Sequence, residues 1–243
     1  MKQPTTPRRL GIFLGILVAG GLIFWFYQRY SSWGAFATRI AEMGPAGRPP
    51  QSVEELQKAI ATYEGRIERY VKDAAQLGIY WKILAVRLMD KKMYGEALDA
   101  LERAIRFYPE DPSLQYMKGL SAAIMAKSTT GKERSAFFSQ AEQAHLRALE
   151  IDPAYHRSRY ALGVLYVFEL NAPERAIPHL EILLEQQKKD VDAHFVLARA
   201  YYETGQYRKA LDLYDRILSI TKVAEKRRQA EENKKIVQDL LNE

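Results

Sequence analysis

Few side chains in this sequence are of the kinds that usually carry chemistry. Among its 243 residues there is no cysteine and there are four histidines. The lack of cysteine excludes a disulfide framework, a cysteine-based zinc site and a thiol nucleophile. The histidines do not have the spacing of metal ligands, and no H-E-x-x-H motif is present. They are His145, His156, His179 and His194.

Two other stretches contain residue types found in phosphate-binding or acid–base sites. Thr129-Thr130-Gly131-Lys132 matches only the end of a phosphate-binding loop, because the upstream glycine and a preceding strand are missing. We interpret residues 127–134 as a surface loop that joins two long helices. The neighbouring carboxylates Glu231 and Glu232 lie in a strongly charged stretch without an apolar pocket. We therefore expect no catalytic residue, no metal site and no cofactor, and hence no enzyme.

The composition is that of a globular protein with enough apolar residues to form a core. Hydrophobic residues make up 47% of the chain and charged residues 27%. The net charge of +6 comes from 36 basic and 30 acidic residues that are interspersed along the chain. Because the basic excess is small and scattered, it does not indicate a nucleic-acid partner.

An uncharged run near the N-terminus predicts a transmembrane helix over residues 10–27. This run has 18 residues, which as a helix span about 27 Å, near the thickness of a hydrocarbon core. Lys2, Arg8 and Arg9 precede it, so residues 1–9 are expected in the cytoplasm and the rest across the membrane. The small-x-small triplet 35–37 also fits a cleaved signal peptide, but the length of the run favours an uncleaved anchor.

Small residues recur every fourth position along this segment, at Gly11, Gly15 and Ala19. That spacing lets two transmembrane helices approach closely, so these residues are a candidate homodimer face. Residues 28–51 contain several glycines and the pair Pro49-Pro50, which is typical of a linker.

A capping box, Ser52 to Glu55, predicts a helix over residues 52–77. We expect this helix to cap the N-terminal end of the domain that follows, with one apolar face turned inward. That face comprises Leu56, Ile60, Tyr63, Ile67, Tyr70 and Val71.

The stretch from Trp81 to Pro109 has the pattern of two short antiparallel helices. Its first apolar stripe is Trp81, Leu84, Ala85 and Leu88, and its second is Tyr94, Ala97, Leu101 and Ala104. This order of small, aromatic and proline residues resembles the tetratricopeptide repeat, a helix–turn–helix unit of 34 residues. The resemblance implies an all-α solenoid, because one such unit cannot bury its own apolar face.

Three further copies of the pattern follow, so we expect four repeats over 78–111, 112–155, 156–190 and 191–222. The second is ten residues longer, and its markers are Tyr116, Gly119, Leu120 and Ala123, then Phe138, Ala141, His145 and Ala148. His145 thus takes an inward position and is expected in the core. A thin apolar stripe in the charged residues 223–243 predicts a C-terminal capping helix, and this stripe includes Ala230, Ile236 and Val237.

The family resemblance implies that the first helix of each pair lines a concave groove for a protein or peptide. In this register the groove carries aromatic and basic side chains, which are common at protein interfaces. The expected groove residues are Lys82, Val86, Met89, Tyr116, Arg157, Tyr160, Phe168, Phe195, Arg199 and Tyr202. Lys82, Arg157 and Arg199 are further expected to meet an acidic peptide.

One subset of the family clamps the terminal carboxylate of chaperones with Lys and Asn residues. Val86, Met117 and Ala161 stand at clamp positions here, which disfavours that activity. The sequence instead indicates a membrane-anchored scaffold that binds a protein partner in an envelope assembly. In a bacterium this is a single-pass inner-membrane protein with a periplasmic solenoid. The alternative is a periplasmic chaperone for exported proteins, which would bind many clients.

Overall fold

A computed structural model describes residues 52–242, and over this range the chain is entirely helical, as predicted. The predicted transmembrane segment 10–27, its flanks 1–9 and 28–51, and the candidate dimer face of Gly11, Gly15 and Ala19 lie outside the described residues. Within 52–242 no helix combines the length and apolarity needed to span a bilayer. The helices are α2 (Val53–Asp90), α3 (Tyr94–Phe107), α4 (Pro112–Ser128), α5 (Gly131–Ile151), α6 (His156–Phe168), α7 (Pro173–Gln186), α8 (Val191–Glu203), α9 (Tyr207–Ile220) and α10 (Ala224–Asn242).

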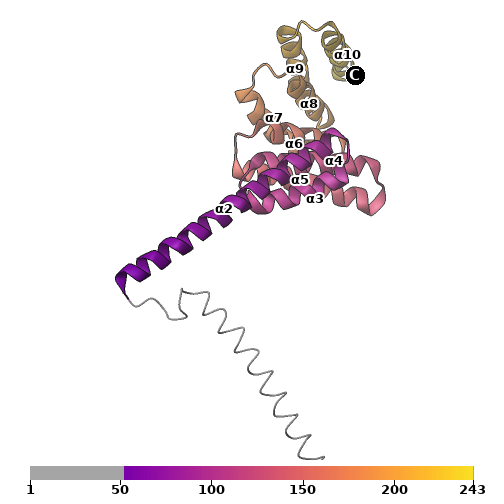
Figure 1. Cartoon of the computed structure of the whole chain (residues 1–243). Coiled ribbons are helices and arrows are strands. Elements are labelled where there is room, and N and C mark those ends of the chain that lie inside the picture. The colour runs from indigo at the N-terminus through magenta and orange to yellow at the C-terminus, as the bar shows by residue number, and fades with distance from the viewer. Residues whose placement is uncertain (1–51, 243) are drawn as a thin grey trace, which may run out of the picture. The chain divides into compact units, whose positions relative to one another are not determined.

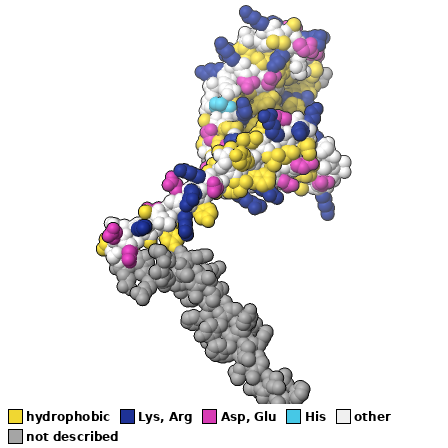
Figure 2. All heavy atoms as spheres, in the orientation of Figure 1, with side chains coloured by type: hydrophobic (Ala, Val, Ile, Leu, Met, Phe, Trp, Pro, Cys, Tyr) yellow, Lys and Arg dark blue, Asp and Glu magenta, His cyan; other side chains and the backbone are white. Residues whose placement is uncertain are grey.

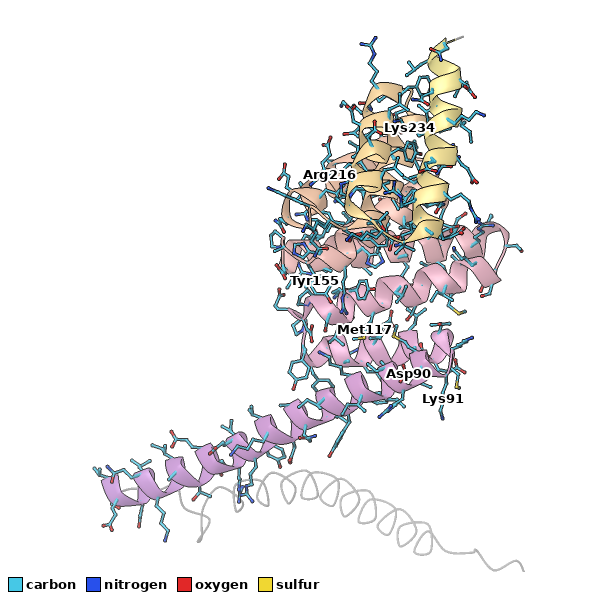
Figure 3. The ribbon with its side chains drawn as sticks, turned by 90° about the horizontal axis from the view of Figure 1, so that it is seen from above. Asp90, Lys91, Met117, Tyr155, Arg216 and Lys234 are labelled. Carbon is cyan, nitrogen blue, oxygen red and sulfur yellow. The ribbon has the colours of Figure 1, made fainter. Side chains whose placement is uncertain are left out.

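The chain divides into two compact units, residues 1–71 and residues 72–243. In the second unit every helix from α4 onward packs against the next one along the chain, and α10 packs on α9. The first helices of successive pairs also meet, α4 with α6 and α6 with α8. Figures 1 and 3 show this serial stacking from α3 to α10. This serial arrangement is that of a solenoid.

The two helices of a pair touch where one of them has almost no side chain. A Cβ added at Gly163 of α6 would lie 2.6 to 2.9 Å from the side-chain carbons of Leu180 in α7. At Gly119 of α4 it would lie 2.6 to 2.8 Å from the His145 ring in α5. In the other pairs Ala85 and Ala198 take this role, and both are fully buried. A hydrogen or a methyl group is therefore the largest group that fits at the crossing.

The extra residues of the second pair lengthen its two helices, as expected, but the loop between these helices is shorter than expected. α4 and α5 have 17 and 21 residues, whereas α6 and α7 have 13 and 14. Only Thr129 and Thr130 separate α4 from α5, so the expected surface loop at 127–134 is wrong. Thr129 ends α4 and caps its last turn, because its Oγ1 donates to the Met125 carbonyl at 3.2 Å.

The inward face of α4 is turned by one residue from the predicted one. Tyr116, Leu120 and Ala123 are only partly buried, and among the four expected markers Gly119 alone is buried. The buried face of α4 comprises Leu114, Gln115, Gly119, Ser121, Ala122 and Ala126. The expected markers stand one residue too far along α4, because Tyr116, which is also expected in the groove, was taken as the first of them in place of the buried Gln115.

The segment expected as a separate capping helix is continuous with the first helix of the first pair, since α2 runs from Val53 to Asp90. Its start does have the predicted capping box, in which the Glu55 amide donates to Ser52 Oγ at 3.1 Å. The side chains expected to face inward are exposed instead, and they are Leu56, Ile60, Tyr63, Ile67, Tyr70 and Val71. The prediction that this face is buried is wrong, because the spacing of apolar residues identifies an apolar face but does not show which element packs against it.

The Gly163 crossing predicts a loss of stability on the smallest possible substitution. Gly163→Ala should lower the free energy of unfolding by about 1–3 kcal/mol, because Leu180 must move to admit the methyl group. The matched control is Gly95→Ala in α3, where the nearest atom to the new Cβ is 3.8 Å away. Chemical denaturation of both variants checks this, and equal stabilities would contradict the close crossing.

His145 lies in the core, as predicted, and is only 2% exposed. Its Nδ1 lies 3.4 Å from Ser158 Oγ, and its ring stands 5.7 Å from that of Tyr116. Burial lowers the pKa of His145 to about 4, because the imidazolium would lose its hydration. Between pH 6.5 and 4 the His145 imidazole is therefore protonated in the unfolded chain but neutral in the folded chain.

From this shift, His145 should reduce stability by about 3 kcal/mol as the pH falls from 6.5 to 4. Leucine stands at the corresponding positions 101 and 180, so His145→Leu should fold and should flatten this part of the pH profile. Urea unfolding of both proteins across this range checks the prediction. An unchanged slope in the variant would show that His145 does not supply it.

Candidate functional site

The residues predicted to line a groove lie on the first helix of each pair, and none of the ten is fully buried. Lys82, Val86 and Met89 are on α2, Tyr116 is on α4, and the rest are on α6 and α8. Arg157, Phe168 and Arg199 are well exposed, whereas Tyr160, Phe195 and Tyr202 are half-buried. These last three also pack on the core formed by α6 to α10.

Four of the ten side chains meet in one pocket of about 370 Å³ at the C-terminal end of the array. It is bounded by α6, α8 and α10, with Tyr214 of α9 behind them. Figure 2 shows a hollow over α8 and α10 with hydrophobic side chains in it and Lys and Arg side chains around it. The lining residues are Phe168, Phe195, Val196, Arg199, Tyr202, Tyr214, Gln229, Asn233, Ile236 and Val237.

Sequence reasoning missed the wall contributed by α10. Ala230 and Val237 are buried, so α10 closes the array as expected of a capping helix. Gln229, Asn233 and Ile236 lie on its neighbouring face and complete the pocket. Their spacing of three and four residues is that of one helical face, a signal the sequence did contain. α10 thus lines the pocket at the position that the first helix of a further repeat would occupy.

The pocket is aromatic with a polar edge. The rings of Phe195 and Tyr214 lie 6.4 Å apart, and the Arg199 guanidinium stands 5.3 Å from the centre of the Tyr202 ring. Burial raises the pKa of Tyr214, so its hydroxyl remains a neutral donor at physiological pH. Amide groups of Gln229 and Asn233 offer both donors and acceptors.

The three cations expected to share a face are not equally available. Lys82 Nζ lies 2.6 Å from Asp111 Oδ2 and 3.2 Å from Ser113 Oγ. Burial by itself raises the pKa of Asp111, but the hydrogen bonds from Lys82 and Ser113 outweigh it and leave that pKa below its usual value. Asp111 also caps α4, so Lys82 is held at a helix end. We infer that Lys82 has a structural role.

The charge of Arg199 is paired within its own helix, since its Nε lies 2.6 Å from Glu203 Oε1 one turn further along α8. The Arg199 side chain is 51% exposed and that of Glu203 is 22% exposed, so the guanidinium keeps an open side at which a ligand carboxylate can compete for it. Arg157 is exposed on α6 and, within residues 52–242, has no ion pair within 4.0 Å. The structure therefore leaves Arg157 and Arg199 as the cations that a partner can reach.

In the N-terminal part of the predicted groove, on α2 and α4, the expected residues pack against neighbouring side chains and do not line a pocket. Met89 packs on the core of the first pair, together with Trp81 and Leu88. The Tyr116 ring lies tilted against those of His145 and Tyr155, with ring centres 5.7 and 5.8 Å away. These side chains are held by their own neighbours, so they form a wall rather than a pocket. Val86 is the more exposed of the predicted residues on α2.

No cluster of three or more His, Asp or Glu suited to a metal ion is present in the described range. Among the histidines, His179 stacks on Tyr166 and is kept neutral by burial and by Arg159 and Arg175, which lower its pKa. The pocket itself is lined by neither histidine nor carboxylate. Its chemistry is that of apolar contact and hydrogen bonding.

Comparison with known proteins supports the repeat assignment. Residues 167–225 match the family model described as tetratricopeptide repeat. The chain is 27% identical over 194 residues to the TPR repeat-containing thioredoxin TTL4 of Arabidopsis thaliana. This match covers 73% of the chain but only 27% of that longer protein.

Solved structures of repeat proteins share the fold. YrrB, described as a TPR protein with an unusual peptide-binding site, is 21% identical with a TM-score of 0.54 over 82% of this chain and 89% of its own. TTC0263, a TPR protein of Thermus thermophilus, is 19% identical with a TM-score of 0.54 over 73% and 93%. MamA residues 41 to the end, from Desulfovibrio magneticus RS-1, is 18% identical with a TM-score of 0.53 over 70% and 96%.

These identities are low enough that the structural matches speak for the fold alone. The family model runs from the end of α6 through α7, α8 and α9. It includes the pocket residues that α8 and α9 contribute, whereas Gly163 and most of α10 lie outside it. Residues 167–225 thus match the tetratricopeptide repeat, and the described helices form an all-α array with the fold of tetratricopeptide-repeat structures.

Proposed function

We propose that this chain is a membrane-anchored scaffold that binds one protein partner in the pocket between α6, α8 and α10. The observation that carries the proposal is the meeting of Phe168, Phe195, Arg199 and Tyr202 with the polar face of α10. Aromatic side chains and arginine dominate the binding energy of protein interfaces. The fold itself is one that serves protein–protein interaction, and YrrB is described as having a peptide-binding site.

The pocket suits a peptide that presents one apolar side chain beside polar backbone. Its volume of about 370 Å³ is near the lower end of the range for ligand sites, so it holds a side chain rather than a large cofactor. The amides of Gln229 and Asn233 can pair with the peptide's own amide groups. Because the walls are helices packed on a core, little ordering is needed on binding.

The anchoring part of the proposal depends on the sequence of residues 10–27, which is uncharged and long enough to span a bilayer. In a bacterium we propose the inner membrane, with the N-terminus in the cytoplasm and the helices in the periplasm. Tethering would raise the effective concentration of the pocket near membrane partners. A second copy would be joined through Gly11, Gly15 and Ala19.

The apolar half of the pocket is tested by Phe168→Ala, since Phe168 is 55% exposed and its loss should leave the fold intact. We expect partner affinity to fall by about 2 kcal/mol, roughly thirtyfold, as for a central aromatic contact. The control is Val223→Ala, because Val223 is equally exposed but lies outside the pocket. Quantitative pull-down from solubilised membranes measures both, and equal recovery of the partner would reject the pocket.

The charge at the rim is tested by a pair of reversals. Arg199→Glu on α8 should weaken binding of a partner with an acidic residue by about tenfold, because like charges then face each other. Arg216→Glu on α9 makes the same charge change outside the pocket lining, and should have no effect (Figure 3). If both reversals act equally, the pocket does not select its partner by charge.

A photo-crosslinker placed at residue 168 distinguishes a scaffold from a chaperone. A scaffold should yield one crosslinked protein in fixed ratio, whereas a chaperone for exported proteins should yield many. Many products of unrelated mass would overturn the proposal in favour of the second function.

A further inference from the structure

The first half of α2 exposes an unbroken row of large apolar side chains. Six of them are between 40% and 73% exposed, which is unusual for so many apolar residues on one helix. Figure 2 shows hydrophobic side chains at the surface of this part of α2, among charged ones. The row comprises Val53, Leu56, Ile60, Tyr63, Ile67 and Tyr70.

The spacing of this row is that of a coiled coil. Successive members are separated alternately by three and four residues, and the alternation continues through Ala74 and Leu77 on the same helix. This is the seven-residue repeat with apolar residues at its first and fourth positions, a and d. It produces the narrow seam by which one helix packs along another of similar length. Residues 53–77 thus contain more than three heptads.

The residue types indicate how many helices the seam joins. Three of the four a positions are the β-branched Val53, Ile60 and Ile67, and the fourth is Ala74. Leu56 and Leu77 occupy two of the four d positions, and tyrosines occupy the other two. β-Branched residues at a with leucine at d favour two parallel strands. The other positions of the segment are mostly charged or polar, as the outer face of a two-stranded coil requires.

The flanking charges permit a parallel pair in register. In such a pair a residue preceding an a position faces the residue five places further along the other copy. Ala59 would then face Glu64, and Arg66 would face Val71, so no like charges are opposed. The apolar spacing of the seam therefore suits a second copy of this helix, and the flanking positions named here set no like charges against it.

We propose that residues 53–77 of α2 pair with the same segment of a second copy of this chain as a parallel two-stranded coiled coil. The proposal does not depend on the pocket at the other end of the chain. If both hold, each dimer carries two pockets, and a partner with two binding segments is held far more tightly than by one.

The absence of cysteine makes the seam directly testable in the full chain in detergent micelles. Ile60→Cys and Ile67→Cys each place one thiol at an a position, where the two copies meet. Lys58→Cys places it on the opposite face of the helix as a control. Under mild oxidation both seam variants should form disulfide-linked dimers about tenfold faster than the control, because only they can approach within bonding distance.

Each alternative arrangement gives a different result, and each would overturn the proposal. Antiparallel pairing would link at most one of the two seam variants. A monomeric chain in sedimentation with its seam thiols shielded from alkylation would mean that residues 1–51 cover the seam. Loss of the crosslinks on adding Gly15→Leu would assign the dimer to residues 10–27 instead.

Two further variants test the seam without cysteine. Ile60→Asp with Ile67→Asp should abolish the dimer, while the thermal transition of residues 72–243, a separate compact unit, should stay unchanged. Gly65→Ala should strengthen the dimer severalfold, since a Cβ there meets no atom within 4 Å and glycine disfavours helix. A dimer insensitive to both changes would contradict the coiled coil.

Discussion

The architecture depends on how closely two helices of a pair can approach. At Gly119 and Gly163 even a Cβ would lie within 2.9 Å of the facing side chain, and at Ala85 and Ala198 a methyl group is fully enclosed. This approach lets one large residue on the second helix fill the crossing. Each pair then presents flat sides that stack on the next pair. The first helices are thereby brought into mutual contact, and the pocket depends on that contact.

The sequence was sufficient for the fold because its signal recurs. Small residues, aromatics and prolines return in the same order in several pairs, and a single misread position does not alter the result. α4 illustrates this, since its inward face was misplaced by one residue at Tyr116 while the helix pair was still expected in the right place. Residues 127–134 were misread as a loop because threonines and a glycine are typical of linkers, although only Thr129 and Thr130 lie outside a helix.

The pocket was predictable only in part. Phe168, Phe195, Arg199 and Tyr202 follow from the repeat register, which applies equally to every copy. The register could not show that α10 closes one end of the groove, because the capping helix lies outside the repeat pattern. Nor could it show that Lys82 is held by Asp111, since that pair joins residues 29 positions apart. Contacts of this kind depend on the packing of particular side chains.

The central claim is that a protein partner binds the face formed by the first helices and α10. Hydrogen exchange of the full chain, with and without a partner recovered from membranes, tests this most directly. The account predicts slower exchange in α6, α8 and α10 on binding, with α5, α7 and α9 unchanged. Protection confined to α5, α7 and α9 would place the partner on the opposite face and contradict the account.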